Sequence, residues 1–395
     1  MRILQLCHKP PTPAVDGGCI AMLAATKAMI NAGHQVKILA METHKHPFSI
    51  NPGNKALVAQ TNMEVFFVNT AIKPLHAFLN LFSGESYNIS RFYHQDFEKH
   101  LIKTLQGQSF DVVQLESLFA APYLDAIRKY SPHSKIILRA HNVEHIIWEI
   151  MASKAVFFKA PYLNLLASRL KKYELAVFQK VDGIIAISAD DAKKIQNFAP
   201  GAAVTSIPVN VDVLQHNHKS NGDIFYIGAF DWYPNLYGVN WFLKEVWPNV
   251  KQEAPEISFN IAGRKMEANL KPVPINNVIY HGEVADSRSF MEHHGIMVVP
   301  LFAGSGIRIK ILEAMALGKA VISTSLGAEG IACKPGKEII IANTATEFIE
   351  AIAKCSKNPG FIADIGQNAS NFVKDNLSTE KLGDNFSRFF KSIQD

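Results

Sequence analysis

The residues best suited to chemistry lie in one short segment of the second half of the chain, VVPLFAGSGIRIKILEAMALGKAVIST. An apolar strand is predicted to end at Pro300, after which Gly304, Ser305 and Gly306 open a helix. The free amides and the dipole of a helix N-terminus favour an anion, and Arg308 in the first turn can fork onto phosphate oxygens. The segment therefore predicts a binding site for a diphosphate.

Two charged residues follow in the same predicted helix. Lys310 and Glu313 are three positions apart, so they share one face of the helix. Lys310 would add positive charge beside a phosphate, and the ionised carboxylate of Glu313 could accept hydrogen bonds from the two hydroxyl groups of a ribose. The alternative is a surface salt bridge between the two side chains.

Three further candidates in the first half each follow a predicted strand, because ligands of open parallel sheets gather beyond the carboxyl ends of the strands. The loop after ILQL ends in Gly17 and Gly18 at a helix start, where the backbone can approach a ligand or simply turn tightly. His141 follows SKIILRA and is either a ligand contact or a hydrogen-bonded loop histidine. Glu116 ends DVVQLE and is expected to face the cleft, where it could bind an acceptor.

Predicted strands and helices position these candidate residues. Short β-rich runs alternate with longer amphipathic segments, and this alternation occurs twice along the chain. Strands separated by helices predict right-handed crossovers and parallel sheets. The polar stretch SIPVNVDVLQHNHKSNGD separates the two sets and is typical of a linker, placed at 212–222. We therefore predict an α/β protein of two domains, one formed by residues 1–212 with a terminal helix at 376–395, the other by residues 222–375.

The composition supports two domains and a cytoplasmic location. The chain has 395 residues, more than the roughly 250–300 at which single cores stop growing. No apolar run approaches the ~20 residues of a membrane-spanning helix, and the short apolar run at the N-terminus is typical of a buried strand rather than a signal peptide. The four cysteines are far apart in the sequence, as expected of reduced cysteines in the cytoplasm.

Positive charge is concentrated in the first half, where residues 1–205 hold 22 Lys/Arg against 15 Asp/Glu. Such a surface could meet an anionic membrane or a phosphate-bearing substrate, or have no partner at all. The clearest cluster, Arg169, Lys171 and Lys172, follows AVFFKAPYLNLLA, which is either an ordinary amphipathic helix or a helix lying in the membrane interface. Basic residues are not interleaved with stacking aromatics, which argues against nucleic acid as a partner.

The stretch GSGIRIKILEAMALGKAVISTSLGAEGI resembles the signature of family-four retaining glycosyltransferases of the GT-B fold, in a bacterial branch associated with exopolysaccharide assembly. Its EAMA run matches the second signature glutamate, Glu313, whereas Ser305 stands where the family usually has its first. The Arg–Lys pair that usually follows the first strand of the second domain is missing, and Arg308 with Lys310 is expected to neutralise the diphosphate instead. PPTPAVDGG, RAHNVE and DWYPNLYGVNWF extend the resemblance over nearly the whole chain.

The resemblance implies two facing Rossmann-like domains that close about the linker. It also implies transfer of a sugar, with retention, from a nucleoside diphosphate sugar to a glycan or lipid-linked acceptor in bacterial surface polysaccharide biosynthesis. His141 would lie near the donor sugar, and Arg264 with Lys265 near the nucleotide phosphate or base. Val284 would belong to the loop that grips the base through backbone groups, and Glu313 would bind the ribose. His141 and Glu313 are thus the candidates for catalytic residues.

No cofactor is expected beyond the donor sugar nucleotide. The sequence has no closely spaced His, Asp and Glu set with metal-ligand geometry, and a basic loop could neutralise the diphosphate directly. The absence of a G-x-G-x-x-G fingerprint argues against a nicotinamide enzyme. Two alternatives stay open, a sugar-nucleotide epimerase or hydrolase on the same fold and a non-catalytic donor-binding scaffold. A peripheral position on the inner face of the membrane also stays open.

Overall fold

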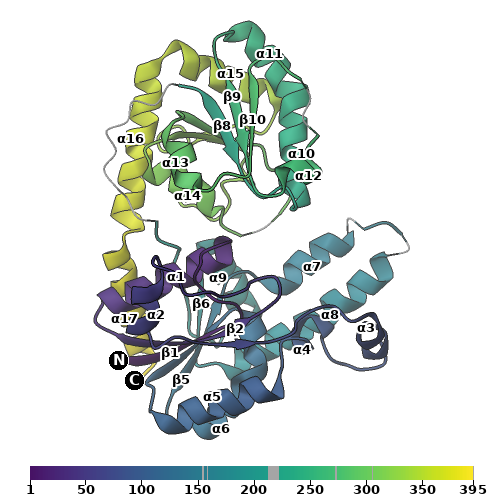
Figure 1. The fold of residues 1–395 in the computed structure, drawn as a ribbon, viewed down its shortest axis with the longest axis vertical. Helices are drawn as coiled ribbons and strands as arrows, with labels where there is room; N and C mark the ends of the chain where they lie inside the picture. The colour runs from purple at the N-terminus through teal and green to yellow at the C-terminus, as the bar shows by residue number, and fades with distance from the viewer. Residues whose placement is uncertain (154, 158, 212–221, 272–273, 305, 395) are drawn as a thin grey trace. The chain divides into compact units, whose positions relative to one another are not determined.

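The computed structural model describes residues 1–395 except 154, 158, 212–221, 272–273, 305 and 395 (Figure 1). The chain divides into two compact units. The first unit comprises Met1–Asn210 together with Thr379–Asp395, and the second comprises Val211–Ser378. Apart from Gly222, the predicted linker 212–222 lies outside the described residues.

The first unit is built on a seven-stranded sheet in which every strand pairs in parallel with its neighbour. The spatial order is β3-β2-β1-β4-β5-β6-β7. The strands are β1 (Arg2–Cys7), β2 (Gln35–Glu42), β3 (Glu64–Phe67), β4 (Val112–Glu116), β5 (Lys135–Ala140), β6 (Gly183–Ala186) and β7 (Val204–Ser206). The sequence predicts all of these except β7, whose three residues form a run too short and too polar to recognise.

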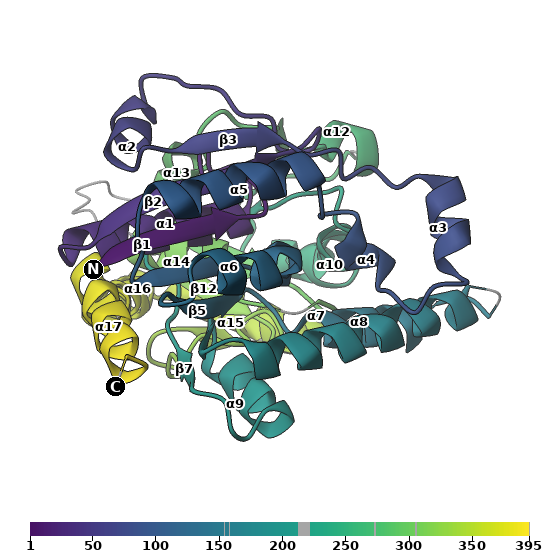
Figure 2. The same ribbon diagram turned by 90° about the horizontal axis from the view of Figure 1, so that it is seen from below.

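Helices connect the strands of the first unit and cover both faces of its sheet (Figures 1 and 2). They are α1 (Gly17–Asn31), α2 (Lys55–Gln60), α3 (Pro74–Asn80), α4 (Tyr87–Ser90), α5 (Gln95–Gly107), a 3-10 turn (Leu118–Tyr123), α6 (Leu124–Tyr130), α7 (Glu144–Ser153), α8 (Ala160–Lys180), α9 (Ala189–Phe198) and α17 (Thr379–Ser392). The Asp190–Asp191 pair lies in the first turn of α9, and the side chain that caps the helix is that of Ser188, which accepts a hydrogen bond from the Asp191 amide.

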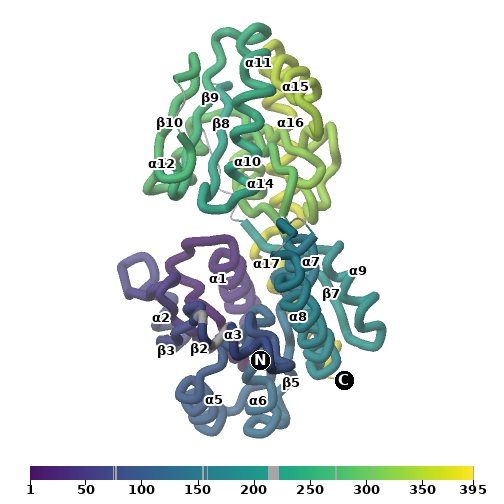
Figure 3. The backbone as a smooth tube through the Cα atoms, turned by 90° about the vertical axis from the view of Figure 1, so that its right-hand side faces the viewer, coloured from purple at the N-terminus to yellow at the C-terminus, as the bar shows by residue number. Residues whose placement is uncertain are grey.

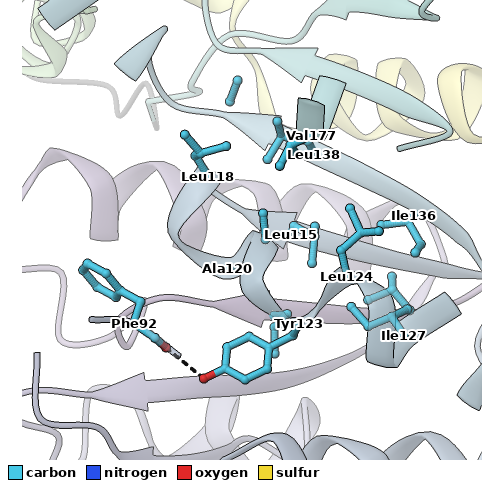
Figure 4. Packing of buried hydrophobic residues seen from close by; sticks show 14 of the residues in the cluster. Phe92, Leu115, Leu118, Ala120, Tyr123, Leu124, Ile127, Ile136, Leu138 and Val177 are labelled. Carbon is cyan, nitrogen blue, oxygen red and sulfur yellow. Dashed lines mark hydrogen bonds between the residues drawn. The ribbon is translucent and has the colours of Figure 1, made fainter. Parts of the chain in front are cut away.

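Because successive side chains of a strand point to opposite faces, β1 contributes to two cores. Leu4 and Leu6 join the larger core, which Figure 4 shows around Leu115, Leu138 and Tyr123. The Tyr123 hydroxyl donates a hydrogen bond of 2.8 Å to the Phe92 carbonyl oxygen, which satisfies the one polar atom that this aromatic ring buries.

The opposite face of the first sheet is covered by α1 and by the terminal helix α17. Phe386 and Phe390 of α17 are fully buried there beside Met29 of α1. A Cβ atom added to Gly383 would come within 2.7 Å of the Ala28 carbonyl oxygen, so the two helices approach closely because this position has no side chain. The first unit is therefore completed by residues that follow the whole second unit in sequence.

The second unit has a six-stranded parallel sheet with the order β10-β9-β8-β11-β12-β13. Figure 3 shows β10, β9 and β8 side by side in that order. The strands are β8 (Ile224–Ile227), β9 (Phe259–Ala262), β10 (Val278–Gly282), β11 (Ile296–Val299), β12 (Ala320–Ser323) and β13 (Ile340–Ile341). Its helical segments are α10 (Tyr233–Trp241), a π-helical turn (Phe242–Val246), α11 (Trp247–Glu253), α12 (Met266–Asn269), α13 (Ser287–Glu292), α14 (Ile309–Ala316), α15 (Ala345–Lys357) and α16 (Pro359–Asn376).

Each sheet has a point at which the strand order reverses. In the first unit it lies between β1 and β4, and in the second between β8 and β11. Loops that leave the carboxyl ends of two such strands diverge to opposite sides of the sheet, so the crevice between them is the usual ligand site of an open α/β sheet. The two switch points therefore indicate where to look for a site in each unit.

We expect Gly238→Ala to destabilise the second unit. A Cβ atom at Gly238 would come within 1.9 Å of the Pro300 carbonyl oxygen, so α10 would have to move away from the end of β11. Overpacking of this kind costs about 1–3 kcal/mol, measured as a fall in the free energy of unfolding in urea. Gly107→Ala is the matched control, because Gly107 is also helical and its Cβ would meet nothing within 4 Å. Equal stability of the two variants would contradict the expectation.

Candidate functional site

At the switch point of the second unit, the loops after β8 and β11 meet through an aromatic ring. Trp232, the N-cap residue of α10, comes from the first loop, and Gly304 comes from the second. A Cβ atom at Gly304 would lie only 2.7 Å from the indole ring, and its backbone has φ of +118°. Both the space and the backbone conformation therefore require glycine at this position.

Arg308 lies directly beside this contact. Its guanidinium carbon is 5.6 Å from the centroid of the Trp232 ring, and Nη1 donates a hydrogen bond to the Gly306 carbonyl oxygen. Burial lowers the pKa of Arg308 to about 10, with the nearby Glu329 opposing the shift, so the side chain stays cationic at neutral pH. The ring and the carbonyl oxygen hold a fixed positive charge at the switch point.

The start of the helix differs from the prediction. Arg308 is the N-cap residue of α14 rather than part of its first turn, because Gly304 and Gly306 both have positive φ and turn the chain before the helix begins. Ser305, which the sequence assigned to the same loop, lies outside the described residues. The Ile311 amide already donates to the Arg308 carbonyl oxygen, but the helix still begins beside the guanidinium, which is a favourable arrangement for an anion.

Lys310 and Glu313 form the salt bridge that the sequence left open as the alternative. Lys310 Nζ is 2.7 Å from Glu313 Oε2 and also donates a hydrogen bond of 2.8 Å to the Ser287 hydroxyl. The positive charge of Lys310 is thus partly neutralised within the protein. The Glu313 side chain keeps about a quarter of its surface exposed, at 23%, and is open to a further donor.

Arg264 is held by a carboxylate of the neighbouring loop. Its Nη2 donates to both oxygens of Asp231 at 3.1 and 3.0 Å, and the Phe230 amide donates to the Arg264 carbonyl oxygen. Lys265 has a left-handed backbone at the start of α12, and its amide donates to Glu283. The structure therefore pairs the Arg264 guanidinium within the protein and holds Lys265 through its backbone amide.

Three glycines bring the backbones after β8, β9 and β10 together. A Cβ atom at Gly263 would come within 1.8 Å of the Gly228 carbonyl oxygen, and the Gly263 amide donates to the Gly282 carbonyl oxygen at 2.8 Å. We call the backbone around these three glycines the glycine ledge. Val284 follows the ledge and packs against the core that includes α14. The ledge therefore offers backbone groups rather than side chains to anything that lies on it.

At the switch point of the first unit, the loop after β1 forms an ion-pair cluster beside Gly17 and Gly18. Lys9 Nζ is 2.8 Å from both oxygens of Asp16, and His46 Nε2 donates to the same carboxylate at 2.9 Å. Although burial acts to raise the pKa of Asp16, hydrogen bonds from His46 and Lys9 hold it well below its usual range. Asp16 also caps α1 by accepting the Cys19 amide. Lys9, Asp16 and His46 were not predicted from the sequence.

Gly18 has a defined reason to be glycine. A Cβ atom there would lie 2.8 Å from Lys9 Nζ, so the absence of a side chain lets the ammonium group lie over the start of α1. Gly17 is the first residue of the helix and is exposed. The loop after β1 therefore combines exposed backbone with a fixed ammonium group, whereas the sequence alone showed only the two glycines.

Glu116 does not face a cleft as the sequence suggested. Its side chain is completely buried, because it lies on the sheet face that α1 and α17 cover. One carboxylate oxygen accepts hydrogen bonds from Gln5 and Gln114, each at 2.7 Å. The other accepts from Arg139 at 3.2 Å and from His141 Nε2 at 2.7 Å. Glu116 therefore acts on any ligand only through the residues that it holds.

The carboxylate and the backbone carbonyl of Glu116 fix the tautomers of two histidines at the carboxyl edge of the sheet. Burial works to raise the pKa of Glu116, but Arg139 and His141 hold it well below its usual range, so it is ionised. Burial lowers the pKa of His141 and of His8, so both rings are neutral at physiological pH. His141 Nε2–H donates to the carboxylate, and His8 Nδ1–H donates at 2.8 Å to the Glu116 carbonyl oxygen.

The remaining ring nitrogens, Nδ1 of His141 and Nε2 of His8, are consequently hydrogen-bond acceptors. The two ring centroids are 6.2 Å apart. A pair of neutral acceptors at this spacing suits the hydroxyl groups of a sugar better than it suits an anion. His141 was predicted from the sequence and His8 was not, although each directly follows a strand, His8 after β1 at the switch point and His141 after β5, the neighbour of β4.

Among the residues that the structure describes, no group of three or more His, Cys, Asp or Glu side chains could hold a metal ion. All four cysteines are free, and Cys7, Cys19 and Cys355 are buried. Of the helices described, none has the length and apolar character to cross a membrane.

The sequence is similar to one family model and to a relative over nearly its whole length. Residues 221–358 match the family model described as Glycosyl transferases group 1. Over 99% of its length the chain is 24% identical to an uncharacterised 44.6 kDa protein of the cps region of Klebsiella pneumoniae, of which it covers 99%.

Two solved structures of other proteins have the same fold. Sucrose-phosphate synthase of Thermosynechococcus elongatus has a TM-score of 0.70 at 14% identity, with 100% of this chain and 99% of that one covered. HepE of Anabaena, solved in complex with UDP, has a TM-score of 0.67 at 13% identity, with 99% of this chain and 100% of that one covered.

The chain has two parallel sheets, each with a switch point. Together with these matches, this architecture identifies a glycosyltransferase of the GT-B fold. Its second unit carries the Glycosyl transferases group 1 domain. The fold class and the glycosyltransferase assignment predicted from the EAMA segment are thereby confirmed. The match to the cps-region protein agrees with the predicted exopolysaccharide branch.

We expect Glu116→Gln to destabilise the first unit. The substitution keeps the volume but leaves the Arg139 guanidinium, which is completely buried, without an anion. Breaking a buried ion pair in this way costs about 3–5 kcal/mol, measured as a loss in the free energy of unfolding in urea. Glu149→Gln is the control, because it removes the exposed pair with Lys171 and should change stability by less than about 1 kcal/mol. A Glu116→Gln protein as stable as the control would refute the buried ion pair.

A second expectation concerns Glu144, whose pKa is raised to about 7 by burial and by the neighbouring Glu174. Below the unfolded pKa of 4.5 the side chain is protonated in both states and has no effect on stability. As the pH rises towards 7, the unfolded state ionises first, so folding becomes less favourable. Glu144→Gln should therefore stabilise the protein at pH 8 by up to roughly 3 kcal/mol, and much less at pH 5.

The measurement is urea unfolding of wild type, Glu144→Gln and Glu149→Gln across that pH range. Glu149 lies on the same helix but is exposed, so its variant should show no pH-dependent difference from wild type. A constant difference for Glu144→Gln at all pH values would show that the carboxyl group titrates normally.

Proposed function

We propose that this glycosyltransferase moves a sugar, with retention of anomeric configuration and without a metal ion, from a nucleoside diphosphate sugar to a glycan or lipid-linked acceptor. The observation that carries the proposal is the fixed cation of Arg308 at the start of α14, at the switch point of a group 1 domain. The cps-region relative supports a role in bacterial surface polysaccharide biosynthesis. Because HepE was solved with UDP, a UDP-sugar is the first donor to test.

In this proposal the second unit binds the donor nucleotide. The guanidinium of Arg308 and the free amides of α14 bind the diphosphate and stabilise the negative charge that develops as it leaves. The Glu313 carboxylate accepts the ribose hydroxyl groups, and the glycine ledge after β8, β9 and β10 offers backbone groups to the base. Arg264, Lys265 and Val284 would border the nucleotide. Arg308 would supply the charge that a divalent cation supplies elsewhere, and Lys310 would add to it if its pair with Glu313 opens.

In the first unit, His141 and His8 accept hydrogen bonds from sugar hydroxyl groups, and Glu116 keeps both rings in the tautomer that can do so. Lys9, beside Gly17 and Gly18, places an ammonium group at the same edge of the sheet. We assign no covalent nucleophile. The acceptor hydroxyl attacks the anomeric carbon on the same face from which the diphosphate departs, and its proton passes to the leaving phosphate as the bond to the diphosphate breaks. Attack on that face retains the anomeric configuration. The protein contributes positioning and charge.

We expect Arg308→Ala to weaken donor binding at least about tenfold, since a hydrogen bond to a charged group contributes about 1.5–3 kcal/mol. The measurement is calorimetry with UDP-, GDP- and ADP-sugars in the presence of a chelator. Glu313→Ala should weaken binding of the same nucleotide through the lost ribose contact. Lys357→Ala is the control, because it removes a cation of the same unit from an exposed pair with Glu253.

Each outcome has a clear meaning. Unchanged affinity in Arg308→Ala would remove that residue from the diphosphate site, and binding that requires added Mg²⁺ would contradict metal independence. Conversion of the donor without any acceptor would indicate an epimerase or hydrolase. Donor binding with no transfer to any polysaccharide-derived acceptor would indicate a non-catalytic scaffold.

A further inference from the structure

The second unit exposes aromatic side chains at the start of α10 that the proposed donor site does not use. Of the four large hydrophobic residues that are exposed in the described part of this unit, three are aromatic and lie within six positions of one another. They are Trp232 at 37%, Tyr233 at 71% and Tyr237 at 48%. Exposed apolar side chains normally occur singly, so this concentration indicates an interaction surface.

The exposed rings continue into the loop after β11. Tyr233 and Tyr237 are one helical turn apart, with ring centroids 6.2 Å apart and an interplanar angle of 37°. Tyr237 then meets Phe302 of the next loop at 6.2 Å and 90°. Phe302 is half-buried, because its ring packs at 4.6 Å against Trp241. We call the surface formed by Tyr233, Tyr237 and Phe302 the aromatic face.

The backbone that carries the aromatic face is held by close contacts. A Cβ atom at Gly238 would come within 1.9 Å of the Pro300 carbonyl oxygen, so α10 lies directly against the end of β11. The Asn235 side chain donates a hydrogen bond of 2.9 Å to the Ala229 carbonyl oxygen, which ties the first turn of α10 to the loop after β8. A surface that is ordered in advance loses little conformational entropy when a ligand binds.

The aromatic face adjoins the proposed diphosphate site. Trp232, directly before Tyr233, contacts the guanidinium of Arg308, and Phe302 lies in the same loop as Gly304. In the order β10-β9-β8-β11, the glycine ledge lies at the end of β8, β9 and β10, whereas Phe302 follows β11. The aromatic face is therefore on the other side of β8 from β9 and β10. In a nucleoside diphosphate sugar the diphosphate likewise separates the base from the sugar.

The chemistry of the aromatic face suits a sugar. From Gly228 to Phe242 the sequence contains no cation, and its one anion, Asp231, is paired with Arg264. Such a surface has no attraction for an anionic lipid or a nucleic acid. The C–H groups of a pyranose ring form an apolar face that fits the electron-rich face of an aromatic ring, and its hydroxyl groups can exchange hydrogen bonds with tyrosine hydroxyls.

We propose that Tyr233, Tyr237 and Phe302 bind a sugar ring of the acceptor glycan. This inference rests on the proposed function, because the acceptor has to approach the donor sugar that the second unit carries. It also narrows the class of acceptor, since a site for a second sugar ring is of use only when the acceptor is an oligosaccharide, free or lipid-linked. A lipid phosphate without sugars would leave the aromatic face empty.

The test is saturation-transfer NMR of the full chain with neutral oligosaccharides in the absence of any sugar nucleotide. The probes are maltohexaose and cellohexaose, with glucose as the single-ring comparison, and titration gives each dissociation constant. Wild type should bind at least one hexasaccharide more tightly than glucose. Tyr233→Ala/Tyr237→Ala should bind it at least about tenfold more weakly, because two stacking rings are lost.

Two further variants separate stacking from simple apolar contact. Tyr233→Phe/Tyr237→Phe keeps both rings and should recover most of the affinity that the alanine variant loses. Tyr233→Leu/Tyr237→Leu keeps apolar surface without rings and should not recover it. The matched control is Tyr93→Ala/Tyr162→Ala, which removes the two exposed tyrosines of the first unit and should bind as wild type does. Urea unfolding should show similar stability for all of these variants, because the substituted side chains are largely exposed.

The proposal is overturned if wild type binds neither hexasaccharide, or if the alanine variant binds as wild type does. Equal recovery by the leucine and phenylalanine variants would show an apolar contact rather than sugar stacking. A dimer that only the alanine variant dissociates in sedimentation velocity would show an interface between two copies of the chain. Donor affinity, measured separately by calorimetry, should be unchanged in the alanine variant. Wild type that binds oligosaccharide but no donor would refute the proposed function and leave the aromatic face as a glycan site.

Discussion

The first unit is organised around one buried negative charge. The Glu116 carboxylate has no contact with water, and an isolated ion in that position would cost several kcal/mol. Four donors from three adjacent strands and the residue after them compensate for the lost hydration, namely Gln5, Gln114, Arg139 and His141. Because Phe386 of α17 packs over the Arg139 guanidinium at 5.9 Å, the same charge also ties the terminal helix to the histidine at the edge of the sheet. The tautomer of His141 and the packing of α17 against the sheet thus both depend on this one carboxylate.

The candidate site of the second unit is built from different contacts. Where the first unit uses a polar network beneath the strand ends, the second uses close backbone approach at Gly228, Gly263 and Gly304. The indole of Trp232 covers the last of these and stacks with the guanidinium of Arg308. Both arrangements lie beside the point at which the strand order reverses, where two neighbouring strands send their loops apart and leave room between them.

The sequence was sufficient for the fold because both sheets are buried on two faces, so nearly every strand is a continuous apolar run between helical segments. It also pointed to His141, which directly follows such a run, and to Arg308, which ends the loop between β11 and α14. It could not show that the Glu116 side chain is buried. The last residue of a strand points to one face of the sheet or the other, and the register alone decides which. Nor could it show that Lys310 binds Glu313, or that Lys9, Asp16 and His46 meet, because those contacts depend on rotamers and on loops brought together from distant positions.

The place of α17 in the sequence has a consequence for how the chain folds. Residues 211–378 form a unit that is continuous in sequence, so all of its core is available as soon as that stretch has been synthesised. The first unit is not continuous, because Phe386 and Phe390 complete a core that residues from β1 and α1 began several hundred positions earlier. During synthesis the order of completion is therefore inverted, and the unit translated later becomes native first. Until α17 arrives, the face of the first sheet that carries the Glu116–Arg139 pair is left partly uncovered, which makes the nascent first unit a natural client for chaperones.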